Sequence, residues 1–141
     1  MQSFQGKTAV LTGAGSGFGL ACAHRAAALG MNLVLIDVQA DALSAAAAAL
    51  SPTGVAVMTA VTDVADAAAM DALANDVMAR FGAPHLVFNN AGVGTSGLLW
   101  EATTAEWDWV MGVNVWGVIH GVRVFTPRML EAAKGDPTYQ G

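Results

Sequence analysis

Short runs of apolar, often β-branched residues alternate with longer alanine-rich stretches along most of this chain. The short runs are apolar throughout, which is typical of strands buried on both faces of a parallel sheet. The sequence predicts strands over residues 8–12, 33–36, 55–59 and 86–88, and helices over residues 17–29, 41–50, 66–81 and about 103–134. This order predicts an α/β fold with a doubly wound parallel sheet and helices on both of its faces.

The last predicted helix contains a start signal and a helix-breaking residue. Thr103 and Glu106 have the spacing of a capping box at its start, and Pro127 predicts a kink or a local break. One side of the helix is small or apolar, and a second side holds large apolar residues, so more than one side requires burial. The first side is Val110, Val113, Gly117, Gly121 and Val124; the second is Trp109, Trp116 and Ile119.

Charge and cysteine content exclude several kinds of partner. The 141 residues hold six Lys and Arg against eleven Asp and Glu, a net charge of −5, which argues against nucleic acid and anionic membranes as partners. The uncharged run 42–62 is broken by a turn signal at 51–54, so we predict no membrane-spanning segment. The single cysteine, Cys22, fits a reducing compartment, and we expect a cytoplasmic protein.

Metal and thiol chemistry have little support in the sequence. The three histidines are far apart, and Cys22 and His24 face different directions on one predicted helix, so we predict no metal site. Cys22 lies among alanines, where we expect a small buried thiol that packs and does not react.

The most distinctive segment is Thr-Gly-Ala-Gly-Ser-Gly-Phe-Gly at residues 12–19, between the first strand and the first helix. Such a turn gathers backbone N–H groups and the positive end of a helix at one point, which suits a phosphate. Its glycines are spaced differently from the G-x-G-x-x-G pattern, and a purely structural tight turn is the alternative. Its position nevertheless favours a Rossmann-like nucleotide site at the end of the first strand.

Asp37 ends the second predicted strand, where an acid can accept hydrogen bonds from both hydroxyls of an adenosine ribose. A 2′-phosphate about 4 Å from this carboxylate would be repelled by roughly 4 kcal/mol per charge at an effective dielectric constant of 20. We therefore predict NAD in preference to NADP as the cofactor. A turn or helix-capping role for Asp37 is the alternative.

Together these features resemble the short-chain dehydrogenase/reductase family. The matching motifs are T-G-x-x-x-G-[IF]-G at 12–19, Asp37, the pair Asp63-Val64, and N-N-A-G at 89–92, followed by Asn114 in the last helix. The match spans nearly the whole chain, and Phe18 replaces the commoner isoleucine. The resemblance implies a sheet of strand order 3-2-1-4, with the later strands absent from these residues.

The resemblance also implies a role for each motif. Gly13, Ser16, Gly17, Phe18 and Gly19 would cradle the pyrophosphate, and Asp37 would bind the adenosine ribose. Asp63 would accept from the adenine amino group beside the Val64 backbone. Asn90, Ala91 and Gly92 would lie under the nicotinamide-side ribose. Asn114, the one catalytic residue expected here, would hold a water in the proton relay. Helix capping by Asp63, a local turn at 89–90 and a solvent-facing Asn114 are the alternatives.

The function implied is an NAD-dependent oxidoreductase that interconverts a small secondary alcohol and a ketone. The family's catalytic serine and Tyr-x-x-x-Lys would lie beyond residue 141, because Tyr139 sits in a turn region. We therefore expect residues 1–141 to be an NAD-binding domain, the N-terminal part of a longer single-domain chain, inactive alone. A non-catalytic nucleotide-binding fragment or sensor is the alternative, and an S-adenosylmethionine-dependent methyltransferase a weaker one.

The family resemblance also bears on assembly. Related proteins pair through the corresponding long helix, so we expect a homodimer or homotetramer through residues 103–134. Ordinary core packing would use the same apolar residues and remains the alternative.

Overall fold

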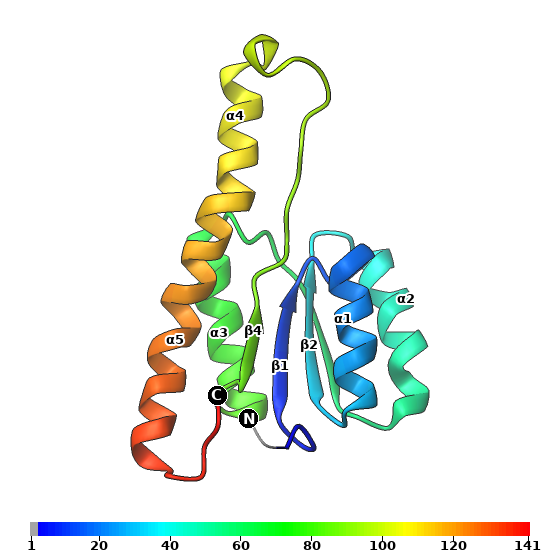
Figure 1. Cartoon of the computed structure of the whole chain (residues 1–141), viewed down its shortest axis with the longest axis vertical. Coiled ribbons are helices and arrows are strands. Elements are labelled where there is room, and N and C mark those ends of the chain that lie inside the picture. Colours follow the sequence, from blue (N-terminus) through cyan, green and yellow to red (C-terminus); the bar gives the residue numbers. More distant parts are fainter. Residues whose placement is uncertain (1–2) are drawn as a thin grey trace.

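The computed structural model describes residues 3–141, which form a parallel four-stranded sheet between two layers of helices (Figure 1). The strands are β1 (Thr8–Thr12), β2 (Asn32–Asp37), β3 (Val57–Val61) and β4 (Leu86–Phe88), in the spatial order β3-β2-β1-β4. The helices are α1 (Gly17–Ala28), α2 (Ala40–Leu50), α3 (Ala67–Phe81), α4 (Thr104–Met111) and α5 (Gly117–Gly135). Two short 3-10 turns, η1 (Ser51–Thr53) and η2 (Leu99–Glu101), and a π-helical segment, η3 (Gly112–Trp116), complete the chain. The predicted fold class and strand order are confirmed.

The sheet separates two apolar clusters, which explains why its central strands β1 and β2 are apolar between their end residues. Leu33 and Leu35 of β2 pack with residues of α1 and α2, whereas Val34 and Ile36 pack with residues of α3 and α5. All five residues of β1 are buried. Because neighbouring residues of a strand point to opposite faces, a strand covered on both faces favours apolar side chains at every position between its ends.

Most predicted boundaries hold to within a residue or two, and β3 shows why they move. The predicted strand 55–59 is shifted to Val57–Val61, in register with β2 from Leu33↔Val57 to Asp37↔Val61. The Ala56 N–H is instead bound by the Asn32 side chain at 3.2 Å. Pairing with the neighbouring strand, which a single-strand pattern does not contain, sets the limits of β3.

The last helix is interrupted, although not where the sequence predicts. The capping box at Thr103 and Glu106 is confirmed, but α5 continues through Pro127, so the expected break is absent there. Pro127 lies on the exposed side of α5, where a carbonyl freed by the missing N–H can contact water. The irregular turn comes earlier, at η3, which contains Asn114.

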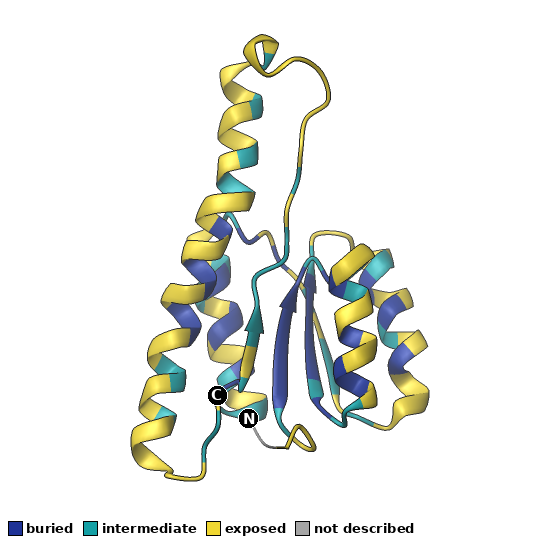
Figure 2. Cartoon of the chain, in the orientation of Figure 1, coloured by how far each residue is buried: buried dark blue, intermediate teal, exposed yellow. Residues whose placement is uncertain are grey.

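The segments α4, η3 and α5 form one long helical unit, residues 104–135, and burial differs sharply between its two ends. Gly117, Gly121 and Val124 of α5 are buried against the body of the molecule, whereas none of α4 is buried. Figure 2 shows α4 and the loop before it extending beyond the sheet with mostly exposed residues. The prediction for Cys22 is wrong: its side chain is exposed on α1, because the helix turns Ala23, Ala26 and Ala27 toward the sheet instead.

Candidate functional site

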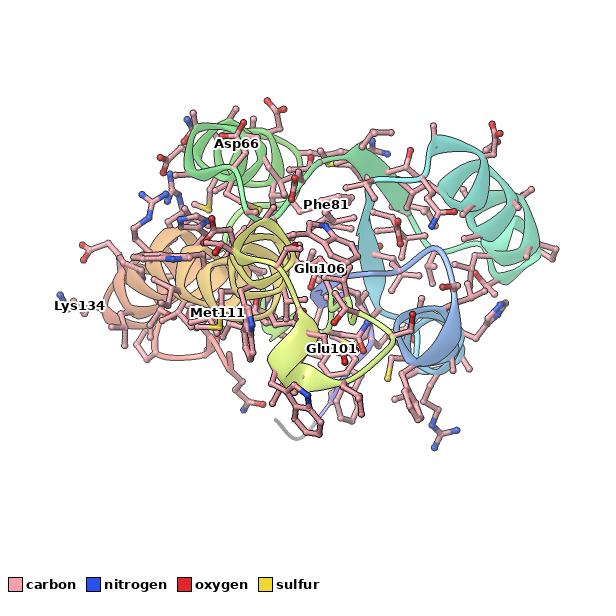
Figure 3. All side chains as sticks on the ribbon, turned by 90° about the horizontal axis from the view of Figure 1, so that it is seen from above. Asp66, Phe81, Glu101, Glu106, Met111 and Lys134 are labelled. Carbon is pink, nitrogen blue, oxygen red and sulfur yellow. The ribbon has the colours of Figure 1, made fainter. Side chains whose placement is uncertain are left out.

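A cavity of about 430 Å³ lies at the carboxyl ends of the four strands. The residues that follow each strand meet there, as expected when parallel strands share one edge of a sheet. Of the predicted site residues, these line the cavity: Gly13, Ser16, Gly17, Phe18, Asp37, Asp63, Val64, Asn90, Ala91 and Gly92. Figure 3 shows the molecule from above, with the η2 turn at Glu101 and the α4 helix near Glu106 toward the viewer, because both extend beyond the sheet (Figure 1).

Steric contacts explain the glycines of the turn between β1 and α1. Gly13 has φ +64°, and a Cβ there would lie 3.0 Å from the Ala91 Cα atom. Gly17 has φ +52°, again in the left-handed region. A Cβ on Gly19 would overlap the Gly13 carbonyl oxygen. These three positions therefore stay free of side-chain atoms, and α1 begins directly against the end of β4.

This turn presents the amino end of α1 to the cavity. Ser16 is the N-cap residue, yet its side chain makes no capping hydrogen bond, and Ser16, Gly17 and Phe18 are exposed. The first N–H groups of a helix have no partner within the helix and carry partial positive charge. Because α1 has 12 residues, its amino end offers N–H donors to an anion in the cavity.

Two backbone N–H groups hold the Asp37 carboxylate in place, and one of them belongs to the glycine turn. Its Oδ2 accepts a hydrogen bond from the Gly15 N–H at 2.9 Å, and its Oδ1 accepts one from the Gln39 N–H at 3.1 Å. A Cβ on Gly15 would lie 2.9 Å from Oδ2 and 2.8 Å from the Ala42 Cβ atom. Gly15 therefore allows the turn to bind the carboxylate directly. Each oxygen keeps lone pairs for ligand hydroxyls.

The loop between β3 and α3 forms the next part of the wall. Asp63 is exposed, and its Oδ1 accepts a hydrogen bond from the Ala65 N–H at 2.9 Å. Val64 is buried, and the Thr62 N–H donates to the Asp37 carbonyl at 3.0 Å. The helix cap is Asp66, whose side chain accepts from Ala68 and Ala69. The alternative that Asp63 caps α3 is therefore wrong.

Asn90 shows a role that the sequence did not indicate. Its Nδ2 donates to the Thr12 carbonyl at 2.9 Å and to the Gly13 carbonyl at 3.4 Å. In return, Thr12 Oγ1 accepts from the N–H groups of Asn90 and Ala91, both at 2.9 Å. The two side chains fasten the end of β4 to the start of the glycine turn. Thr12, which sequence reasoning did not select, is thus a site residue, although the first letter of the T-G-x-x-x-G motif marks it.

Asn114 lies behind the cavity wall and acts on the loop after β4. Its Nδ2 donates to the Val93 carbonyl at 2.9 Å, and its Oδ1 accepts from the Val93 N–H at 2.8 Å. Asn114 is exposed, but both atoms of its amide are used, and it belongs to the π-helical segment. π-Helical turns often occur at functional sites. Nothing in the structure tests its predicted role in proton transfer, which stays a prediction.

One buried polar atom at the edge of this region is unsatisfied. Asn89 Oδ1 has no hydrogen-bond partner among residues 3–141, and it is packed so closely against α5 that a Cβ on Gly121 would overlap it. Such groups are rare in native proteins. Gly121 therefore allows α5 to approach the end of β4.

Other candidate chemistry lies elsewhere. Tyr139 stacks on His85 at a ring distance of 4.8 Å and donates to the Pro84 carbonyl, at the amino end of β4 and far from the cavity; burial raises the pKa of its hydroxyl. In the described part of the chain, no three His, Cys, Asp or Glu side chains are grouped in a way that could hold a metal ion. No helix within residues 3–141 is long and apolar enough to cross a membrane.

Comparison with known proteins places this arrangement in a family. A model of the short chain dehydrogenase family matches residues 7–136. The C alpha-dehydrogenase of Sphingobium sp. is 39% identical over 138 residues, which make up 97% of this chain and 45% of that protein.

Solved structures of the same family are similar to this chain in both fold and sequence. A short chain dehydrogenase/reductase from Burkholderia phymatum in complex with NAD is 53% identical, with a TM-score of 0.89 over 93% of this chain and 47% of that chain. The L-sorbose reductase from Gluconobacter frateurii, complexed with NADPH and L-sorbose, is 33% identical, with a TM-score of 0.86 over 92% of this chain and 50% of that chain. The chain thus spans about half the length of the relatives it matches. Because the family model extends over most of its residues, the chain belongs to the short chain dehydrogenase family.

Proposed function

We propose that the protein is an NAD-dependent oxidoreductase that interconverts a small-molecule secondary alcohol and a ketone. The observation that carries this proposal is the Asp37 carboxylate, held by two backbone N–H groups in the same cavity as the glycine turn. A carboxylate in this position can accept from both hydroxyls of an adenosine ribose. NAD fits better than NADP because a 2′-phosphate would meet a fixed negative charge, and the described lining residues include no Lys or Arg.

The residues of the cavity have separate tasks in this proposal. The N–H groups at the start of α1, with Ser16, bind the pyrophosphate. Asp63 accepts from the adenine amino group, and the backbone of Ala91 and Gly92 lies under the second ribose. The nicotinamide, when bound, supplies the hydride acceptor or donor. Asn114 holds the Val93 backbone with both amide atoms, and in this proposal it is the residue that positions a relay water.

The proton-transfer residues complete the proposal. We place the family's serine and its Tyr-x-x-x-Lys in the part of the whole protein that follows residue 141. Residues 1–141 are then an N-terminal cofactor-binding portion that binds NAD without turnover, which is also how the alternative, a nucleotide-binding fragment or sensor, would behave. We place the protein in the cytoplasm, because an exposed thiol such as that of Cys22 stays reduced there.

We further propose that the side of the long helical unit turned away from the sheet pairs with a second copy, as a homodimer or homotetramer. Trp116 and Ile119 are 55% and 43% exposed on it, whereas Trp109, 50% exposed, lines the cavity and is not part of this surface. Exposed apolar surface of this kind is stabilised when a partner covers it. Replacing Ile119 with Glu should shift sedimentation velocity toward smaller species. An unchanged distribution would exclude this surface.

The cofactor proposal is tested by fluorescence titration with NADH, NADPH and S-adenosylmethionine. NADH should bind more tightly than NADPH, and S-adenosylmethionine should not compete. Tighter binding of NADPH would refute the assignment of Asp37, and binding of S-adenosylmethionine alone would favour a methyltransferase. NADH binding should also weaken in Asp37→Ser, and Asp76→Asn, at an exposed position on α3, is the control for nonspecific effects of removing a negative charge.

A further inference from the structure

The loop between β3 and α3 has little structure of its own to hold it in place. Its internal hydrogen bonds are the Ala65 N–H to Asp63 Oδ1 at 2.9 Å and the Asp66 N–H to the Asp63 carbonyl at 3.1 Å. Yet Asp63 and Val64 line the cavity, on the side where the proposed adenine lies. The position of this part of the cavity wall must therefore be set by contacts from outside the loop.

His120 of α5 makes such a contact. Its Nδ1 lies 2.9 Å from the Val64 carbonyl oxygen, and the His120 residue is buried. A carbonyl can only accept a hydrogen bond, so Nδ1 must carry the proton. His120 does not line the cavity, so any influence on a ligand passes through Val64.

Two glycines bring the helix close enough for this bond. A Cβ on Gly117 would lie 2.6 Å from Val64 Cγ2, and a Cβ on Gly112 would lie 3.5 Å from the Ala65 Cβ atom. The helical unit thus rests on the loop with no side chain of Gly112 or Gly117 in between. His120 is one turn beyond Gly117 on the same side of α5. The glycines set the distance between helix and loop, and the imidazole then binds the loop at one defined atom.

The surroundings of His120 are consistent with a role in positioning. The Trp116 ring lies 6.0 Å away, centroid to centroid, at an interplanar angle of 32°. The charged groups nearby, Arg123 of α5 and Asp71 of α3, form an ion pair of 2.9 Å with each other. Arg123 also donates to the Ala67 carbonyl at 3.3 Å, at the first residue of α3. The start of α3 and the loop before it are therefore both tied to α5, and His120 provides the tie at the cavity wall.

We propose that His120 is a positioning residue for the adenine side of the cofactor site: its Nδ1–H group holds the Val64 carbonyl and so fixes the wall that contains Asp63. This inference rests on the proposed nucleotide-binding function. Loss of the donor leaves a buried carbonyl unpaired, and the loop can satisfy that carbonyl only by moving toward water.

The test compares two substitutions of His120. His120→Leu has no donor. His120→Asn places an amide nitrogen close to the position of Nδ1 and can restore the bond. Arg128→Ala is the control, because it removes the 2.8 Å hydrogen bond from α5 to Asn75 of α3 without touching the loop. The probes are ADP-ribose, which carries the adenosine half of NAD, and nicotinamide mononucleotide, which does not, both measured by calorimetry.

We expect His120→Leu to bind ADP-ribose about tenfold more weakly, while His120→Asn and Arg128→Ala stay within about twofold of the original protein. Affinity for nicotinamide mononucleotide should not change in any variant. Equal ADP-ribose affinity in His120→Leu would overturn the inference, as would an Asn variant no better than the Leu variant, which would indicate loss of general packing.

A second measurement does not depend on ligand. Long-range ¹H–¹⁵N spectra of the histidine side chains should show His120 protonated at Nδ1, and hydrogen exchange at the Ala65 amide should be faster in His120→Leu. The tautomer protonated only at Nε2 would overturn the inference. If the original protein binds neither nucleotide probe, the proposed function fails, and the spectra still decide whether His120 holds the loop.

Discussion

Gly112 and Gly117 offer a matched test of how α5 is seated on the cavity wall. Both have ordinary helical backbone angles, with φ −55° and −58°, so alanine is allowed at either position. They differ in the space around them. A Cβ at position 112 would make an ordinary contact of 3.5 Å with Ala65, whereas one at position 117 would lie 2.6 Å from Val64 Cγ2.

The expected effects on the free energy of unfolding follow from this contrast. Replacing glycine with alanine inside a helix stabilises by about 1 kcal/mol. Adding a methyl group to a tightly packed site costs about 1–3 kcal/mol. The Gly112→Ala variant should therefore be as stable as the original protein or more stable. In Gly117→Ala, the cost of the close contact with Val64 should offset or exceed the stabilisation from helix propensity. A difference of ~2 kcal/mol between the variants corresponds to roughly 6–10 °C in Tm for a chain of this size.

Thermal unfolding followed by circular dichroism measures this difference, and ADP-ribose affinity measures its effect on the site. Gly117→Ala should unfold at lower temperature than Gly112→Ala and bind ADP-ribose more weakly, because Val64 must move. The same Tm for both variants would show that Val64 has room to shift, and the reasoning from close contact would be refuted.

Three further outcomes are expected. Asp37→Ser should weaken NADH binding at least about tenfold, through loss of charge-assisted hydrogen bonds, and raise the ratio of NADPH to NADH affinity; an unchanged ratio contradicts the electrostatic argument. Asn114→Ala should speed hydrogen exchange at the Val93 amide, and unchanged exchange would show that the amide pair does not hold this loop. Burial, and then the charge of Lys7, lower the pKa of His85 below its usual 6.5. The unfolded chain therefore binds a proton more readily, so Tm should fall as pH drops below 6.5, and less steeply in His85→Gln, which lacks this titrating group. Identical pH profiles would exclude His85 as a source of this dependence.

Much of the fold could be predicted from the sequence because its signals are local. Strands covered on both faces require continuous apolar runs such as Thr8–Thr12, and helices need start signals such as the Thr103 capping box, so each element could be recognised without its neighbours. The parallel order followed from the alternation of strands and helices. The glycine turn and Asp37 were visible for the same reason, since each follows directly after a strand and so must lie at one edge of the sheet.

Contacts between distant segments were not visible in this way. The limits of β3 depend on pairing with β2, and the irregular helical turn contains Asn114, whose side chain binds the distant Val93 backbone. The sequence predicted a kink or break at Pro127, but the helix continues there. The carbonyl that loses its partner can contact water, because Pro127 lies on the exposed side of α5. Cys22 was expected to be buried because alanines surround it in the sequence, but the rotation of α1 about its axis decides which of them faces the sheet.

The difference between what the sequence determined and what the tertiary structure decided is clearest at the cavity. The sequence by itself determined which chemical groups follow each strand: N–H donors at the glycine turn, a carboxylate at Asp37 and amides at residues 89–90. Only the tertiary structure decided what each group binds. The Asn90 amide is used by the Thr12 and Gly13 carbonyls, and the His120 imidazole by the Val64 carbonyl. A hydrogen bond requires a partner within about 3 Å in a narrow direction, and for residues far apart in the chain only the packing of the whole molecule sets that distance.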